Sequence, residues 1–229
     1  MNAIHSVPPE IVIAQVETVA ADIRIDAVKV GMLGDLITIE AVARALECLE
    51  TVPIVIDPVM VAESGAVLLD EEARSGLIEL LFPRAAVVTP NLHEARCLTG
   101  LEESASEEDL AIALLGLGPA AAIVTAGHTA RADDLLLVGA PDRIGSPTAY
   151  RLSGPRHPDG AAHGSGCTHS SVLAALLAHG VELPDAAALA RSLAAEAVAS
   201  GLRTVGGGAG PVDVIDLSAQ SRRLNLPAQ

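Results

Sequence analysis

The hydrophobic pattern of the chain changes repeatedly between two periods. Windows with apolar residues three and four positions apart are typical of helices with one buried face, and short continuous apolar runs are typical of strands in a parallel sheet. Helices are predicted at 8–21, 35–49, 70–81, 91–98, 106–115, 165–178 and 185–202, and strands at 26–31, 53–57, 85–89 and 120–124. Segments 134–139 and 149–152 are predicted to form a hairpin at the sheet edge. This alternation predicts an α/β fold, with a mostly parallel sheet covered by helices on both faces.

Polar residues follow four of the predicted strands, at the positions where those strands end. The four segments are 29–32, 57–60, 89–91 and 125–127. Parallel strands end at one edge of a sheet, and ligands of such sheets bind outside that edge. The glycine-bearing stretch at 163–170 should face the same edge. The pattern therefore predicts that polar side chains from distant segments converge on a single site.

The stretch His163-Gly-Ser-Gly-Cys-Thr-His-Ser170 indicates an anion site. Its two glycines allow a tight turn and a close approach of the backbone to a ligand. The first turn of a helix also leaves N–H groups unpaired beside a partial positive charge. The same location should lower the pKa of the Cys167 thiol. The alternative is an ordinary loop before a buried helix, with Cys167 as a small apolar residue.

Two acidic residues are candidates for binding Mg²⁺. Asp57 ends a buried strand, where an unpaired carboxylate is costly, and Glu94 shares a helix face with Asn91. Mg²⁺ takes few protein ligands and keeps several waters, which suits two separate carboxylates. The alternative for Asp57 is a cap on the next turn, and for Asn91 and Glu94 a helix-starting pair. An anion site with Mg²⁺-binding acids suits phosphoryl transfer, although the chain has no P-loop motif.

Composition narrows the choice of partners and compartment. The net charge of −15 argues against a nucleic-acid backbone, and the two aromatic residues, Phe82 and Tyr150, offer no stacking platform. No apolar run reaches the ~20 residues of a membrane span, so neither nucleic acid nor membrane is predicted as a partner. Three cysteines without metal-site spacing are typical of a reduced, cytoplasmic protein. Lys29 is the only lysine, which restricts the choice of a phosphate-binding lysine.

Five motifs, in order, resemble the hydroxymethylpyrimidine/phosphomethylpyrimidine kinases of thiamine biosynthesis, which belong to the ribokinase-like superfamily. They are Lys29-Val-Gly-Met-Leu33, Asp57-Pro-Val-Met60, Thr89-Pro-Asn-Leu-His-Glu-Ala95, His163-Gly-Ser-Gly-Cys167 and Gly208-Ala-Gly-Pro211. The resemblance implies a three-layer α/β/α sandwich. It also implies a phosphotransferase that uses ATP and Mg²⁺ to phosphorylate 4-amino-5-hydroxymethyl-2-methylpyrimidine and then its monophosphate.

The resemblance also implies roles for individual residues. The transferring phosphoryl group would be bound by Gly164, Ser165 and Gly166. Cys167, the fourth catalytic residue, would lie near the acceptor hydroxyl. Contacts with the pyrimidine would come from Met32, Val59 and Cys167. Mg²⁺ would be bound by Asp57 and Glu94. The nucleotide and its phosphates would be contacted by Asn91, Thr125, His163, Gly208 and Gly210.

Three departures from the family pattern bear on activity. The first strand of the family and the glycine-rich motif after it, about 50 residues, have no counterpart in the sequence. Thr125 stands where the family has a lysine that approaches the ATP phosphates, and Ala162 stands where it has a threonine. We therefore expect a single domain over 1–229, truncated at its N-terminus relative to the family, with a frayed tail at 217–229.

Several alternatives and one partner follow from these departures. An open strand edge favours pairing with a second chain, so a homo-oligomer, a dimer, is expected. Related enzymes accept another ring, which leaves a pyridoxal- or pyridoxine-type kinase as an alternative function. The replaced lysine and the absent N-terminal segment favour a further alternative, a non-catalytic pyrimidine- or nucleotide-binding relative.

Overall fold

The computed structural model describes residues 5–49, 51–60, 68–126, 133–140 and 145–217. Its centre is a six-stranded sheet whose strands lie side by side in chain order. The strands are β1 (Val28–Val30), β2 (Ile54–Ile56), β3 (Val87–Val88), β4 (Ala121–Val124), β5 (Asp134–Val138) and β6 (Thr148–Leu152). Strands β1 to β4 pair in parallel, and β4–β5 and β5–β6 pair antiparallel. The mostly parallel sheet and the hairpin at its edge are confirmed.

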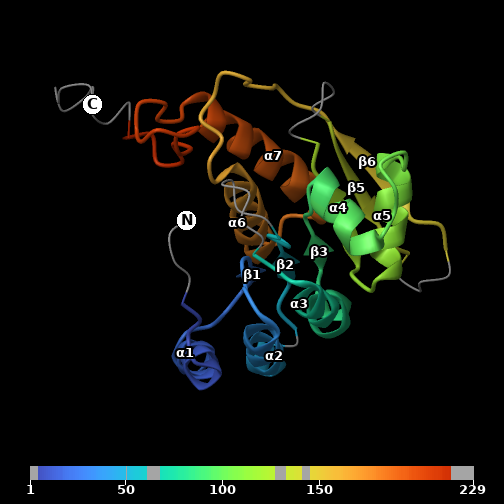
Figure 1. Ribbon diagram of the computed structural model, residues 1–229, viewed down its shortest axis with the longest axis vertical. Coiled ribbons are helices and arrows are strands. Elements are labelled where there is room, and N and C mark those ends of the chain that lie inside the picture. The colour runs from blue at the N-terminus through green and yellow to red at the C-terminus, as the bar shows by residue number, and fades with distance from the viewer. Residues whose placement is uncertain (1–4, 50, 61–67, 127–132, 141–144, 218–229) are drawn as a thin grey trace.

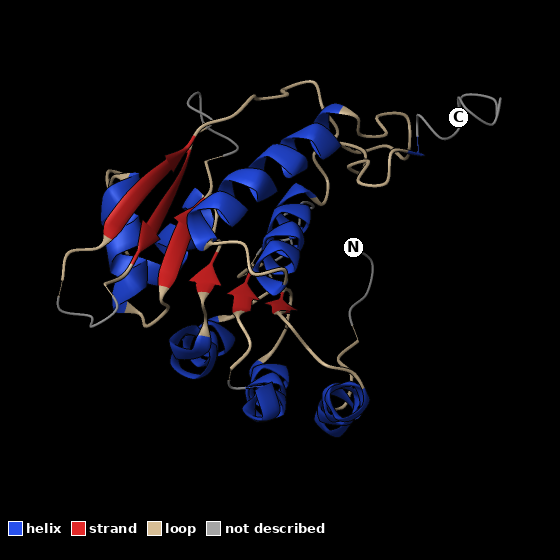
Figure 2. Cartoon of the chain, turned by 180° about the vertical axis from the view of Figure 1, so that it is seen from behind, coloured by secondary structure: helices blue, strands red, loops and turns tan. Residues whose placement is uncertain are grey.

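Helices cover both faces of this sheet (Figure 1). One face is covered by α2 (Leu36–Ala45), α3 (Glu71–Gly76), α4 (Leu92–Thr99) and α5 (Glu107–Gly116), and the other by α6 (Ser165–Ala178) and α7 (Leu183–Ala199). Helix α1 (Pro9–Asp22) packs beside α2 and buries none of its residues. Short helical turns are η1 (Leu46–Leu49), η2 (Leu77–Leu81) and η3 (Phe82–Arg84). Figure 2 shows the same three layers from behind.

The apolar runs of the central strands supply two separate cores. In β2, Ile54 and Ile56 pack with α2 to α5, whereas Val55 between them packs with α6 and α7. Strand β4 divides its side chains in the same way. Successive side chains of a strand point to opposite faces, so a strand that is covered on both sides must be apolar throughout. This requirement explains why continuous runs, rather than alternating ones, marked these strands.

Caps fix the starts of the helices on the first face. The Asp35 side chain accepts a hydrogen bond from the Thr38 N–H at 2.8 Å, and Asp70 accepts one from Ala73 at 2.8 Å. Both arrangements satisfy N–H groups that the first turn leaves unpaired. The predicted helices at 35–49 and 70–81 are each present, but their last turns tighten into η1 or widen into η2.

The strand ends and one helix start meet at one edge of the sheet. Strands β2, β3 and β4 lead to Asp57, Asn91 and Thr125, and the last two pair through an isolated bridge. Helix α6 packs on β1 and β2, so its first turn lies over the same edge. No described helix combines the length and apolarity that a membrane crossing requires.

Candidate active site

The first turn of α6 presents two free backbone donors. Gly164 caps the helix with φ 87°, a left-handed conformation that favours glycine and turns the incoming loop into the helix. The Ser165 N–H is used locally, because it donates to the Ala162 carbonyl at 3.0 Å. Within the described residues, the N–H groups of Gly166 and Cys167 have no hydrogen-bond partner. These two amides are the donors left open at the predicted anion site, and Gly164 shapes the turn before them.

Asp57 lies under this turn and is almost fully buried, with 6% of its surface exposed. Its Oδ2 atom accepts a hydrogen bond from the Ser170 hydroxyl at 2.9 Å. The same oxygen lies 3.5 Å from the Lys29 ammonium. Asp57 therefore connects β2 to α6 and to β1, and it is more than a cap on the turn that follows it.

Glu94 fits both interpretations that its sequence position allowed. Its side chain accepts from the Asn91 N–H at 2.9 Å, and the Asn91 side chain accepts from the Glu94 N–H at 3.0 Å, which completes a capping box. Glu94 is also buried, and burial raises the pKa of its carboxyl to about 7, with a further contribution from the charge of Asp57. Two neighbouring carboxylates that destabilise each other's charge suit a divalent cation. Within the described residues no larger cluster of metal-ligating side chains occurs.

The Cys167 side chain is exposed at the start of α6, and it lies close enough to Asp57 for the carboxylate to act on the thiol. Burial of the sulfur raises the pKa of the thiol, and the negative charges of Asp57 and Glu94 raise it further, although Lys29 acts in the opposite direction. The expectation that the helix start lowers this pKa was therefore wrong. Desolvation of the sulfur, together with the two carboxylates nearby, outweighs the partial positive charge of the helix end, so Cys167 is a protonated thiol.

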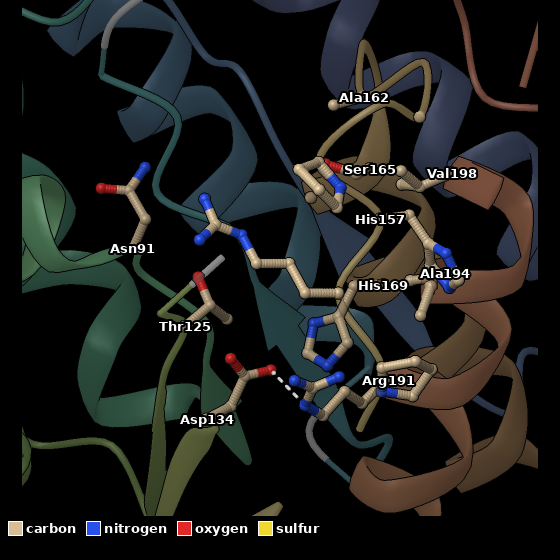
Figure 3. Close-up of a pocket in the computed structure, with 16 residues that line it drawn as sticks. Asn91, Thr125, Asp134, His157, Ala162, Ser165, His169, Arg191, Ala194 and Val198 are labelled. Atoms are coloured by element: carbon tan, nitrogen blue, oxygen red, sulfur yellow. Dashed lines mark ion pairs between the residues drawn. The ribbon is translucent and has the colours of Figure 1, made fainter. Parts of the chain in front are cut away.

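A cavity of about 370 Å³ opens on the other side of the same helical turn. Ser165 and Gly166 line it together with Asn91 and Thr125, and Arg156 also reaches it from the loop before α6. Figure 3 shows Asn91 and Thr125 on one side of the space, facing Ser165 and the residues of α7. The cavity thus brings two predicted nucleotide-binding residues next to the predicted anion site.

The inner wall of the cavity is polar and was not predicted. The Arg191 guanidinium lies 3.5 Å from Asp134, and Asp134 also accepts from the Ala126 N–H at 2.9 Å. Burial raises the pKa of Asp134 to about 6 and lowers that of His169 to about 4. His169 is therefore neutral at pH 7, and its buried Nε2 has no partner within the described structure. The sequence did not reveal these residues as one cluster, because β5 and α7, which carry Asp134 and Arg191, are far apart in the chain.

The other predicted residues lie outside the cavity lining. Met32 follows β1 and is exposed, and Val59 follows β2 and is half-buried. Both strands lie under α6. His163 bonds through its backbone to Gly210 and Val212. A Cβ on Gly210 would lie 2.5 Å from the Leu202 carbonyl, so this glycine allows close packing of two loops. Gly208 is exposed with open space around it.

A sheet covered on both faces, with helix-start amides, buried carboxylates and a cavity at one edge, is the arrangement of the ribokinase-like small-molecule kinases. The sequence profile described as phosphomethylpyrimidine kinase matches residues 1–213. The chain therefore belongs to the phosphomethylpyrimidine kinase family, and it is a phosphotransferase.

Individual relatives support this membership. The hydroxymethylpyrimidine/phosphomethylpyrimidine kinase of Mycobacterium leprae is 38% identical over 218 residues, which are 93% of this chain and 77% of that protein. The thiamine biosynthesis bifunctional protein ThiED of Geobacter sulfurreducens is 39% identical over 97% of this chain and 44% of its own length. The structure of Staphylococcus aureus pyridoxal kinase in complex with AMP-PCP and pyridoxal superposes with a TM-score of 0.77, at 31% identity, over 91% of this chain and 74% of that one.

Proposed function

We propose that this protein transfers the γ-phosphoryl group of ATP to 4-amino-5-hydroxymethyl-2-methylpyrimidine, and then to the resulting monophosphate, in the cytoplasmic synthesis of thiamine. The observation that carries the proposal is the position of the first turn of α6. Ser165 and Gly166 line the cavity, while Cys167, the next residue, is not part of the lining and is subject to the charge of Asp57. A phosphoryl group held at this turn would have a donor side and an acceptor side.

The cavity is the proposed ATP site. Its volume of about 370 Å³ lies in the range of small-molecule pockets. Two arginines line it, and Arg191 is already paired with Asp134. Arg156 has no ion-pair partner among the described residues, so its charge is available to the nucleotide phosphates. We assign to Arg156 the role of phosphate-binding cation, on a wall where Thr125 supplies only a hydroxyl.

Asp57 and Glu94 are the residues that would hold Mg²⁺. The cation would supply positive charge to the phosphate oxygens as negative charge redistributes during transfer. Binding it requires the ionised form of Glu94, and the pKa of about 7 means that a proton must leave this group near neutral pH. The mutual repulsion of the two carboxylates is the feature that fits a cation.

Cys167 is the proposed neighbour of the acceptor hydroxyl. Its raised pKa excludes a stable thiolate as the base at pH 7. Phosphoryl transfer through a loose transition state needs little base strength, since the attacking oxygen carries little charge until late. As the new P–O bond forms, the bond from the γ-phosphorus to the ADP oxygen breaks, and the hydroxyl proton passes to an oxygen of the transferred phosphoryl group. The Cys167 thiol would orient the hydroxyl for this attack. Met32 and Val59 would contact the ring from the segments after β1 and β2.

A pyridoxal-type kinase is the second candidate. The structural similarity to the Staphylococcus aureus enzyme bound to AMP-PCP and pyridoxal favours it. The sequence relatives named as hydroxymethylpyrimidine/phosphomethylpyrimidine kinases favour the pyrimidine. A non-catalytic relative would bind either ligand without transfer.

The decisive experiment follows phosphorus-31 resonances while the protein is incubated with Mg²⁺-ATP and the hydroxymethylpyrimidine. We expect a pyrimidine monophosphate and then a diphosphate, with pyridoxal as a poor competitor. Cys167→Ala should lose most turnover and keep its affinity for AMP-PCP. Phosphorylation of pyridoxal alone would support the second candidate, and binding without any product would support a non-catalytic protein.

We further propose that the chain forms a dimer through the edge of the sheet. Among the described strands β1 pairs only with β2, so the backbone groups on its other side can pair with a second copy. Sedimentation velocity should give twice the monomer mass of 23.2 kDa, whereas a single monomeric species would contradict this assembly.

A further inference from the structure

We propose that Lys29 binds the phosphate group of the monophosphate acceptor and so selects for the second phosphoryl transfer. The inference rests on the proposed function, because only a two-step kinase meets an acceptor that already carries a phosphate. It assigns to this lysine a ligand group, the phosphate monoester of the acceptor, that differs from the phosphates of ATP.

The position of Lys29 places its ammonium on the acceptor side of the site. In β1, Val30 joins the core under α2, so Lys29 points to the opposite face, where α6 lies. Its Nζ atom is 3.5 Å from Asp57 Oδ2, and 21% of the side chain remains exposed. Its charge also acts on the Cys167 thiol, the proposed neighbour of the acceptor hydroxyl. The ammonium is thus near the acceptor and accessible to it.

A glycine near the ammonium leaves room for it. A Cβ built on Gly31 would lie 2.5 Å from Lys29 Nζ, a distance that real side chains do not show. Any larger residue at this position would displace the ammonium from its place beside Asp57. The ammonium therefore occupies space that residue 31 leaves open, and a side chain there would shift the flexible end of Lys29.

The negative charge of the acceptor side explains why an ammonium group is needed there. The acceptor side holds two buried carboxylates, Asp57 and Glu94. A neutral hydroxymethyl group can approach them, but a phosphate dianion is repelled unless a cation offsets the charge. Asp57 already accepts from the Ser170 hydroxyl, so Lys29 is not its sole partner. A compact ammonium with three donors can contact both the carboxylate and a phosphate oxygen.

The kinetic test compares the two acceptors in the intact protein. Lys29→Met should lower kcat/KM for the monophosphate by roughly 10- to 100-fold more than for the hydroxymethylpyrimidine, which is the effect of one lost hydrogen bond to a charged group. Lys29→Arg keeps the charge and should recover most of this difference. Arg24→Met removes an exposed cation that pairs with Asp26 near β1, and it should change neither acceptor. An equal loss for both acceptors in Lys29→Met would overturn the inference.

A binding test uses the wild-type protein and does not depend on how the variants fold. Because Lys29 is the only lysine, acetylation of its peptide, followed by mass spectrometry, reports on one side chain. Without ATP, the monophosphate should slow acetylation at least severalfold more than the hydroxymethylpyrimidine does. Equal protection by both ligands, or by neither, would contradict a contact with the phosphate.

The two failures can be told apart. If the proposed function is wrong, neither pyrimidine is phosphorylated and the comparison of acceptors has no wild-type reference. If only the inference is wrong, both transfers proceed in the wild type and Lys29→Met slows them to the same extent. In that case Mg²⁺ alone would neutralise the phosphate of the acceptor.

Discussion

At the scale of single residues, Glu94 caps a helix at a position where its charge is unfavourable. It completes the capping box of α4, yet it is buried near Asp57, where its charge is unfavourable. Burial favours the neutral form of this carboxyl and raises its pKa to about 7, so near neutral pH the charged form is costly at this position. Such a group weakens the fold when ionised and becomes useful when a cation is bound.

The first prediction concerns Glu94→Gln. The folded pKa of about 7 lies above the model-peptide value of 4.5, so the stabilising contribution is present below pH 4.5 and is lost as the pH rises through 7. Glutamine keeps the N3 acceptor of the capping box and has no charge. The variant should therefore gain roughly 2 kcal/mol of unfolding free energy at pH 8, and much less at pH 5.

Denaturant titrations at the two pH values measure this gain, and a kinase assay measures its cost to function. We expect kcat/KM to fall at least tenfold, and Mg²⁺ to stabilise the wild type but not the variant. A variant that is less stable than the wild type at pH 8 would show that the ionised carboxylate supports the fold.

The second prediction concerns Arg156, which lines the cavity without an ion-pair partner in the described structure. Arg156→Ala should raise the KM for ATP roughly 10-fold, since one charge-assisted contact to phosphate is lost, and should leave the KM for the pyrimidine near its wild-type value. Arg44→Ala is the matched control, because Arg44 is exposed on α2, across the sheet. Unchanged ATP affinity in Arg156→Ala would place the phosphates elsewhere.

Candidate site residues could be predicted from the sequence where a single segment shows that they lie at a strand end or a helix start. The positions of the glycines, Asp57 and Glu94 at a strand end or a helix start were predictable, because their neighbours in sequence reveal these boundaries. Arg156, His169 and the Asp134–Arg191 pair were missed, since their cavity exists only after β5, α6 and α7 pack together. The pKa of Cys167 was mispredicted for the same reason, because desolvation of the sulfur and the charges of Asp57 and Glu94 arise only when distant segments pack together.

At the scale of elements, the first turn of α6 carries the site, and Gly166 tests it. A Cβ on Gly166 would meet no protein atom within 4 Å, so Gly166→Ala should fold normally and gain up to about 1 kcal/mol of helix propensity. Its methyl group would occupy the space in front of the free amides. We therefore expect kcat/KM for ATP to fall at least tenfold.

Gly116 provides the control for this substitution. It ends α5, and a Cβ there also meets no atom within 4 Å. Gly116→Ala should show the same small change in thermal stability without a change in turnover. Equal activities of the two variants would indicate that no ligand approaches the start of α6.

The type and order of the elements were predictable, and their limits were less so. Asp35, Asp70 and Asn91 begin helices as capping chemistry requires. The parallel strands have narrower bounds than their apolar runs: β3 spans Val87–Val88, although the Ala86 and Thr89 N–H groups still donate to Ile54 and Ile56. Helix α1 has apolar positions on one face, yet Ile11 and Val19 stay nearly half exposed. Periodicity predicts a face but cannot supply the surface that covers it.

At the scale of the whole molecule, α6 divides the sheet edge into two regions, which we propose bind different ligands: the nucleotide and the acceptor. The cavity side offers Arg156 and neutral His169 to a nucleotide, and the other side offers Lys29, Cys167 and two carboxylates to an acceptor. In a protein with a net charge of −15, the few cations that meet at this edge are the groups that we propose to bind the phosphates. This division is the central claim.

A crystal structure with AMP-PCP, Mg²⁺ and the hydroxymethylpyrimidine measures it most directly. The account predicts the nucleoside in the cavity, γ-phosphate oxygens about 3 Å from the N–H groups of Gly166 and Cys167, and the acceptor hydroxyl beside the Cys167 sulfur. Electron density that places the pyrimidine in the cavity, or the γ-phosphate away from the start of α6, would contradict it.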